Sequence, residues 1–140
     1  MKKLMLFMLA LTIGVIGGLV SSCSSGVDRT DPRAVAEKAA ECYFNYDYAQ
    51  LKTLVDPNDT FRLEQLDNLL EMAEKYKAEN PDAKPKNKNL TFLKISDRLR
   101  GSDFTPETTA ARVTFESEEG DNIQVFLTLV DGKWCYERIQ

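Results

Sequence analysis

The chain has 140 residues, with 18 basic and 22 acidic side chains and no histidine. This length suits a single folded domain. The acidic balance without a basic stripe argues against a nucleic-acid partner, which needs clustered Lys and Arg to neutralise phosphates.

Residues 1–22 have the composition of an export signal, with two lysines, an apolar core from Leu4 to Leu11 and no acid. The segment ends in Val20-Ser21-Ser22-Cys23, where a branched apolar residue and two small residues precede a cysteine, as is typical of a lipobox. A permanent membrane-spanning helix is the alternative, but the apolar run from Leu4 to Val20 is shorter than the roughly 20 residues that a crossing needs. We therefore predict a lipoprotein signal peptide over 1–22 and lipid attachment to Cys23.

The mature chain is predicted to be an envelope protein held on a membrane by its lipid anchor. Removal of residues 1–22 leaves 118 residues, and the loss of two lysines changes the net charge from −4 to −6. Diacylglycerol plus an amide-linked acyl chain would satisfy the two-signal requirement for stable anchoring. Residues 23–30 are then a lipidated tether and 31–140 a single domain. Ser24 carries no acid that would retain the protein in the inner membrane, so we expect the outer membrane.

Two helices are predicted at the start of the domain. Asp31 and Pro32 form an N-cap and first-turn pair, and apolar residues at helical spacing predict a helix over about 32–46. Asp47 can cap a second, shorter helix. This helix should stop at Asp56-Pro57, because proline disfavours helical geometry in the residue before it.

A third helix is predicted from Asp59 or Thr60 to Asn80-Pro81. Its apolar positions form one stripe between polar flanks, so one face should be buried and the other wet. Residues 81–89 hold two prolines, three lysines and two asparagines, which indicates a loop. The stripe predicted to be buried consists of Leu63, Leu66, Leu69, Leu70, Ala73 and Tyr76.

From Leu90 onward the apolar residues alternate with a period of two, which indicates strands of a half-buried sheet. We predict four antiparallel strands, at 91–99, 110–116, 123–130 and 133–139. Asp131-Gly132 between the last two is a strong signal for a two-residue hairpin. Such a hairpin fixes the register and pairs Val130 with Lys133, Leu129 with Trp134, Leu127 with Tyr136 and Val125 with Arg138.

This register assigns the side chains of the sheet to two faces. The face that the helices should cover carries Val125, Leu127, Leu129, Trp134 and Tyr136, joined by Ala111, Val113 and Phe115. The opposite face should show Phe126, Thr128, Cys135, Glu137 and Ile139. Its apolar residues make it a candidate partner or homodimer surface, with scattered surface apolar residues as the alternative.

Helices followed by an antiparallel meander predict an α+β domain with the helices on one side of a curved sheet. Two short helices around Tyr46-Asp47-Tyr48, a longer amphipathic helix and strands ending in Asp131-Gly132-Lys133-Trp134, all behind a lipobox, resemble the domain of unknown function 4878 family. That family lies within the nuclear transport factor 2-like superfamily, and the resemblance covers nearly all of residues 30–140. It implies a cone-shaped, cystatin-like fold, with a cavity between three N-terminal helices and a curved four-stranded sheet. It implies no known activity.

Some members of that superfamily are isomerases or dehydratases with an aspartate or histidine base and a tyrosine acid inside the cone. In this chain Asp97, with Tyr43, Tyr46 and Tyr136, could supply such a pair. We favour the alternative, in which Asp97 faces solvent from its strand and the tyrosines belong to the core. No catalytic residue is therefore predicted. The candidate cavity residues are Tyr43, Tyr46, Trp134, Tyr136 and Arg138.

The predicted register places Arg138 on the helix-facing side of the sheet, where an unpaired guanidinium would be costly. Either Arg138 holds an anionic ligand at the cone mouth, or a rim position or an acid such as Asp97 satisfies it. We favour the second, because arginine stems often lie over apolar surface with the head in water.

Cys42 and Cys135 remain after lipidation, and the register turns Cys135 away from the helices. We therefore predict two separate thiols, although an exported protein could form a disulfide. Two cysteines without histidine make a poor zinc site, so neither a metal nor another cofactor is expected.

The leading hypothesis is a non-enzymatic envelope lipoprotein whose domain binds a small ligand or a neighbouring envelope protein. The chain has no phosphate loop, nucleophile elbow or paired-carboxylate motif. One alternative is an isomerase or dehydratase, which needs an ionisable group with a shifted pKa in a real pocket. The other is a structural or accessory protein that acts through its surface. A cavity large enough for a ligand or substrate would favour the binding domain or the enzyme, whereas a cone filled by side chains would favour the protein that acts through its surface.

Overall fold

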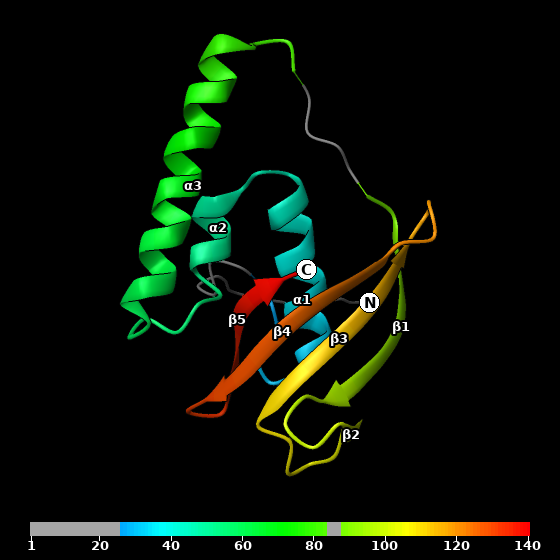
Figure 1. Ribbon diagram of the computed structural model, residues 1–140. Helices are drawn as coiled ribbons and strands as arrows, with labels where there is room; N and C mark the ends of the chain where they lie inside the picture. The colour runs from blue at the N-terminus through cyan, green and yellow to red at the C-terminus, as the bar shows by residue number, and fades with distance from the viewer. Residues whose placement is uncertain (1–25, 84–87) are drawn as a thin grey trace, which may run out of the picture.

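The computed structural model describes residues 26–83 and 88–140. They form an α+β fold, in which N-terminal helices pack on one face of a five-stranded antiparallel sheet that does not close (Figure 1). We call the face that the helices cover the inner face, and the opposite face the outer face. The predicted signal peptide and Cys23 lie outside the described residues.

Each helix begins where the sequence predicts it. An aspartate precedes each first turn, and its carboxylate accepts a hydrogen bond from a backbone N–H of that turn. Such caps satisfy N–H groups that have no partner inside the helix. The caps are Asp31, Asp47 and Asp59, and the helices are α1 (Pro32–Phe44), α2 (Tyr48–Lys52) and α3 (Thr60–Glu79).

Helix α1 ends two residues before its predicted end. Tyr46 has a φ of 61°, which a right-handed helix does not allow. The N–H of Asp47 bonds back to the carbonyl of Cys42 across this corner, at 2.8 Å. The corner turns the chain directly from α1 into α2, as the predicted pair of short helices requires.

Helix α3 extends beyond the rest of the domain (Figure 1). With 20 residues it is about 30 Å long, and it packs mainly on the much shorter α2. Leu66 is the buried residue of its apolar stripe, while Tyr76 is 54% exposed. Leu63, Leu69, Leu70 and Ala73 are half-buried against the core. The prediction of a buried face is therefore confirmed as far as Ala73 and is wrong at Tyr76, which lies in the last turn of the helix.

The sheet has the order β2-β1-β3-β4-β5, with every neighbouring pair antiparallel. All four predicted strands are present. Strand β2 was not predicted, because two residues are too short to show an alternating pattern. The strands are β1 (Leu90–Asp97), β2 (Ser102–Asp103), β3 (Ala110–Ser117), β4 (Asn122–Val130) and β5 (Lys133–Ile139).

A β-bulge in β5 changes the predicted register near the end of the chain. The pairs of Val130, Leu129 and Leu127 are confirmed, but Phe126 then pairs with Arg138 and Val125 with Ile139. Glu137 is the extra residue on β5, and such a bulge moves every later side chain to the other face. The predicted pair of Val125 with Arg138 is therefore wrong. Arg138 belongs to the outer face and Ile139 packs against the core.

The core lies between α1 and the inner face of the sheet. Val35, Ala36 and Ala39 of α1 are fully buried, and their small side chains let the helix approach the sheet closely. All eight inner-face residues predicted from the sequence belong to this core, with Leu129 half-buried. Phe115 at its centre is 2% exposed.

The free edge of β5 is covered by two segments of irregular backbone. The N–H of Trp134 donates to the carbonyl of Arg29 at 2.8 Å, and the N–H of Tyr136 donates to the carbonyl of Leu54 at 2.7 Å. These bonds remove the unpaired groups that make an exposed edge strand prone to aggregation. The folded domain thus includes Arg29, within the segment that the sequence assigns to the tether.

Replacing Phe115 with Ala should lower the free energy of unfolding by about 3–5 kcal/mol, because a buried phenylalanine leaves a cavity. Urea denaturation followed by the fluorescence of Trp134, the single tryptophan, measures this change. The matched control is Phe61→Ala, which removes a ring that is 65% exposed and should stay within about 0.5 kcal/mol of the wild type. Similar losses in the two variants would contradict the assigned core.

Candidate functional site

The structure separates the five predicted cavity residues. Trp134 and Tyr136 are buried in the core. Tyr43, Tyr136 and Arg138 line a shallow cavity of about 390 Å³ between α3 and β5. Tyr46 lines a second cavity of about 340 Å³, on the C-terminal half of α3. Both cavities open at the surface. A third open cavity of about 450 Å³ lies between the C-terminal half of α1 and the sheet, lined by Phe44, Leu90 and Phe115 among others, and buried side chains fill the rest of the space between α1 and the sheet.

The tyrosines form a cluster of rings with little acid or base chemistry to offer. Tyr43 and Tyr48 meet edge to face, with their ring centroids 6.1 Å apart. Burial raises the pKa of Tyr136 well above its usual value, and nearby Tyr43 raises it further, while Arg62 opposes the shift. The hydroxyl of Tyr136 therefore stays protonated and can donate a hydrogen bond, but it cannot act as a base near neutral pH.

Asp97, the candidate base, stabilises a turn. Its carboxylate accepts hydrogen bonds from the backbone N–H groups of Leu99 and Arg100 and from the hydroxyl of Thr108. Burial raises the pKa of Asp97, but the bonds from Arg100, Thr108 and Leu99 outweigh it, so the pKa lies below its usual value. Two parts of the prediction are corrected: Asp97 is buried instead of facing solvent, and it does not pair with Arg138.

Cys42 and Cys135 are both buried and free, which confirms the prediction of two separate thiols. Cys42 lies in the core, and burial raises its pKa to about 11. Burial also raises the pKa of Cys135, although the guanidinium of Arg29 opposes this shift. Thiols that stay protonated near neutral pH are poor nucleophiles.

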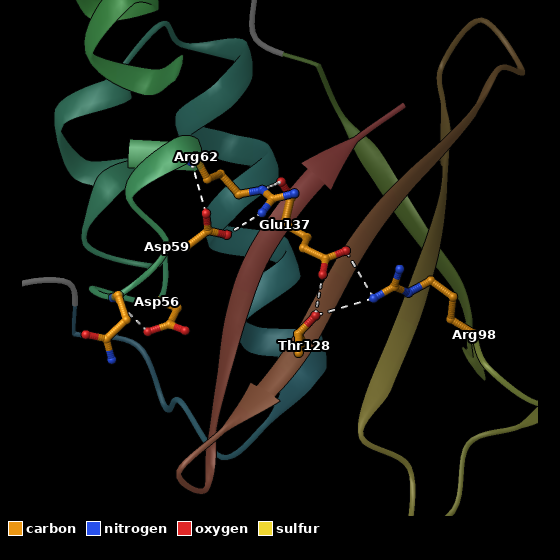
Figure 2. A network of polar contacts seen from close by, with 7 residues as sticks. Asp56, Asp59, Arg62, Arg98, Thr128 and Glu137 are labelled. Carbon is orange, nitrogen blue, oxygen red and sulfur yellow. Dashed lines mark hydrogen bonds and ion pairs between the residues drawn. The ribbon is translucent and has the colours of Figure 1, made fainter. Parts of the chain in front are cut away.

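Glu137, the extra residue of the bulge, connects α3 to the outer face (Figure 2). Its backbone carbonyl accepts a hydrogen bond from Arg62, which also forms an ion pair with Asp59 at the start of α3. Its carboxylate accepts from the Thr128 hydroxyl at 2.6 Å and lies 3.0 Å from an Arg98 nitrogen. One residue therefore joins a helix to two other parts of the sheet.

Arginine side chains cover the outer face, which carries no helix. The ring of Phe126 is 4% exposed, because the guanidinium groups of Arg138 and Arg98 lie over it, 4.1 and 5.7 Å from its centroid. Cys135 is buried, and Ile139 has turned inward. The predicted apolar patch of Phe126, Cys135 and Ile139 is therefore wrong, and the outer face is basic instead.

Arg29 fixes the start of the folded chain. Its guanidinium donates to the carbonyls of Trp134, Thr53 and Leu54 at 2.9, 3.1 and 3.3 Å, and to the sulfur of Cys135 at 3.3 Å. Three carbonyl acceptors around one guanidinium satisfy a half-buried charge. The chain thus enters the domain at a defined point beside β5.

Comparison with protein-family models, curated proteins and solved structures found no match. The site is therefore interpreted from its own residues. Within residues 26–83 and 88–140, no group of three or more Cys, Asp and Glu side chains is arranged to hold a metal ion, and no helix is long and apolar enough to cross a membrane.

Sequence reasoning missed the arginines that cover the outer face. Arg112 alternates with the core residues Ala111 and Val113, so the same period-two argument could have placed it there. Arg138 could not be placed from the pattern, because the bulge at Glu137 has no sequence signature in a strand that otherwise alternates regularly.

Asp97→Asn should destabilise the protein most near neutral pH. The folded-state pKa of Asp97 is lowered, so its contribution is present above the unfolded-state value of about 3.9 and is lost as the pH falls through the folded-state value. The difference in urea midpoint between wild type and variant should shrink from about pH 7 to about pH 3. Asp103→Asn, at an exposed site, is the control. A pH-independent difference would contradict the assigned role.

A double-mutant cycle should find a coupling of roughly 1 kcal/mol between Arg98 and Glu137, because both side chains are about three-quarters buried. The variants are Arg98→Ala, Glu137→Ala and their combination, measured by urea denaturation. The exposed pair of Arg33 and Glu37 is the control and should couple by only about 0.3–0.5 kcal/mol. Equal coupling energies would argue against the network in Figure 2.

Proposed function

We propose that the protein is an envelope lipoprotein, anchored through Cys23, whose domain binds a partner through its surface and catalyses no reaction. The lipobox and the export signal support the anchor. Ser24, which is not an acid, supports an outer-membrane location. The resemblance to the domain of unknown function 4878 family, and with it a cone-shaped fold of the nuclear transport factor 2-like type, is part of this proposal.

One observation carries the choice of surface binding: the space that an enclosed ligand would need is occupied. Leu51, Leu54, Leu127 and Phe115 are all 2% exposed or less and fill the centre of the space between the helices and the sheet, and the cavity that remains between α1 and the sheet is open to the surface. Ligand pockets usually bury most of a small molecule's surface. The clefts among the described residues are shallow and open, which suits contact with another macromolecule better than sequestration of a small one.

The cavity between α3 and β5 supports a second candidate function, the binding of a small ligand. Tyr43, Tyr136 and Arg62 line it and could donate hydrogen bonds to a polar molecule. An isomerase or dehydratase would further need a base there. Glu137 borders the cavity, but its carboxylate is engaged on the outer face by Arg98 and Thr128. Asp97 is engaged by its own turn.

Native mass spectrometry of the protein purified from membranes in mild detergent tests both parts of the proposal. We expect the mass of residues 23–140 plus the lipid, with no further small molecule. Cys23→Ala should remain uncut and without lipid, whereas Cys42→Ala, the matched control, should be lipidated like the wild type. An unlipidated wild type would overturn the anchor, and a reproducible extra mass would favour the small-ligand function.

A further inference from the structure

The outer face is a basic surface on an acidic protein. It carries five cationic side chains, Lys94, Arg98, Arg112, Lys133 and Arg138, whereas the whole chain has a net charge of −4. Three acids share the face. Glu137 is already paired with Arg98, Glu116 lies at the far end of β3, and Asp103 lies on the edge strand β2. The middle of the outer face therefore keeps an excess of positive charge.

Arg112 and Arg138 contribute this excess. The Nε of Arg112 donates to the Ser96 hydroxyl at 3.3 Å, and Arg138 donates to the side-chain oxygen of Gln140 at 2.6 Å. Across the described residues, neither guanidinium lies within ion-pair distance of a carboxylate. Each keeps N–H donors in the planar fork that binds a carboxylate in a bidentate manner.

The sheet register sets the spacing of these two arginines. Arg112 pairs with Phe126, and Phe126 pairs with Arg138, so the three side chains form one row across β3, β4 and β5. Two strand spacings separate the arginines by about 10 Å. A peptide in the extended polyproline II conformation rises about 3.1 Å per residue with three residues per turn. Carboxylates three residues apart then lie on the same side of the peptide, roughly 9 Å apart, and match this spacing. The ring of Phe126 supports Arg138 from below and limits its freedom.

We propose that the outer face docks an acidic, extended segment of a partner envelope protein, whose carboxylates bind Arg112 and Arg138. This inference rests on the proposed surface-binding function and names the surface and the chemistry of the partner. The match of charge provides both steering and specificity, and the open, flat face accommodates a segment of polypeptide.

The position of the anchor favours a protein partner over the membrane surface. The chain enters the domain at the edge of β5, where Arg29 is fixed and Val27 packs against the core. The four Cα–Cα steps from Cys23 to Val27 reach at most about 14 Å. The bilayer is therefore held near that edge. Arg112 lies on β3, two strands further into the sheet, so the row of arginines extends away from the anchored edge.

Fluorescence anisotropy of the detergent-solubilised mature protein tests this inference. The probe is a labelled peptide of Glu-Ser-Ser repeats, and a peptide of Lys-Ser-Ser repeats is its control. We expect the glutamate peptide to bind, with affinity that falls as salt is added. The variant R112Q/R138Q should bind about tenfold more weakly or worse, because it loses two charge-assisted contacts. K75Q/K77Q, which makes the same charge change on α3, should bind like the wild type.

The outcomes separate the docking surface from the proposed function. The docking surface would be overturned if the wild-type protein does not bind the glutamate peptide, or if R112Q/R138Q binds it with unchanged affinity. Lipid attachment is measured separately, by native mass spectrometry. In a second arm the protein is reconstituted through its anchor into phosphatidylcholine vesicles, with or without phosphatidylglycerol. Loss of peptide binding only where phosphatidylglycerol is present would assign the face to the membrane. R112K/R138K keeps the two positive charges but loses the planar guanidinium groups, so it should bind the peptide with intermediate affinity. Circular dichroism checks that each variant is folded.

Discussion

The β-bulge at Glu137 is the constraint on which the arrangement of both sheet faces depends. One extra residue in β5 turns Ile139 towards the core and Arg138 towards the outer face. Both polar groups of Glu137 bind other parts of the chain. Its backbone carbonyl accepts a hydrogen bond from Arg62, and its carboxylate accepts one from Thr128 and forms an ion pair with Arg98. Bulges commonly redirect side chains at functional edges of sheets. Here the bulge places Arg138 on the outer face, where regular alternation would have placed the apolar Ile139.

The polar groups around the bulge hold together parts of the chain that pack weakly through apolar contacts. Helix α3 has one buried leucine, Leu66, so its orientation depends on its packing against α2 and on the bond from Arg62 to β5. A second arginine, Arg29, joins the start of the folded chain to β5 and to the end of α2. Arginine suits both roles, because its fork satisfies several acceptors with one side chain.

Most of the fold could be predicted from local patterns. The caps Asp31, Asp47 and Asp59 mark the helix starts, and Asp131-Gly132 fixes three pairs of the final hairpin. These features depend on a few neighbouring residues, so the sequence displays them directly. The extent of burial along α3 could not be predicted in this way, because its stripe is apolar throughout while its neighbours are short.

The candidate site was harder to predict, because it depends on departures from regular structure. Alternation places Arg138 beside Tyr136 on the inner face, and a single bulge reverses that assignment. Asp97 reads as a solvent-facing strand acid, yet the turn after β1 and the hydroxyl of Thr108 surround it. Both residues owe their roles to irregular backbone, where period-based reasoning has no information.

The most direct test of this account is the position of the Arg138 side chain in solution. Proton nuclear Overhauser contacts, measured on isotope-labelled mature protein in detergent, locate it against its neighbours. The account predicts contacts from Arg138 to the ring of Phe126, with the arginine methylene protons shifted upfield by that ring. Contacts from Arg138 to the side chain of Val125, with Val125 paired opposite Arg138 in place of Ile139, would contradict the bulge and the basic outer face that depends on it.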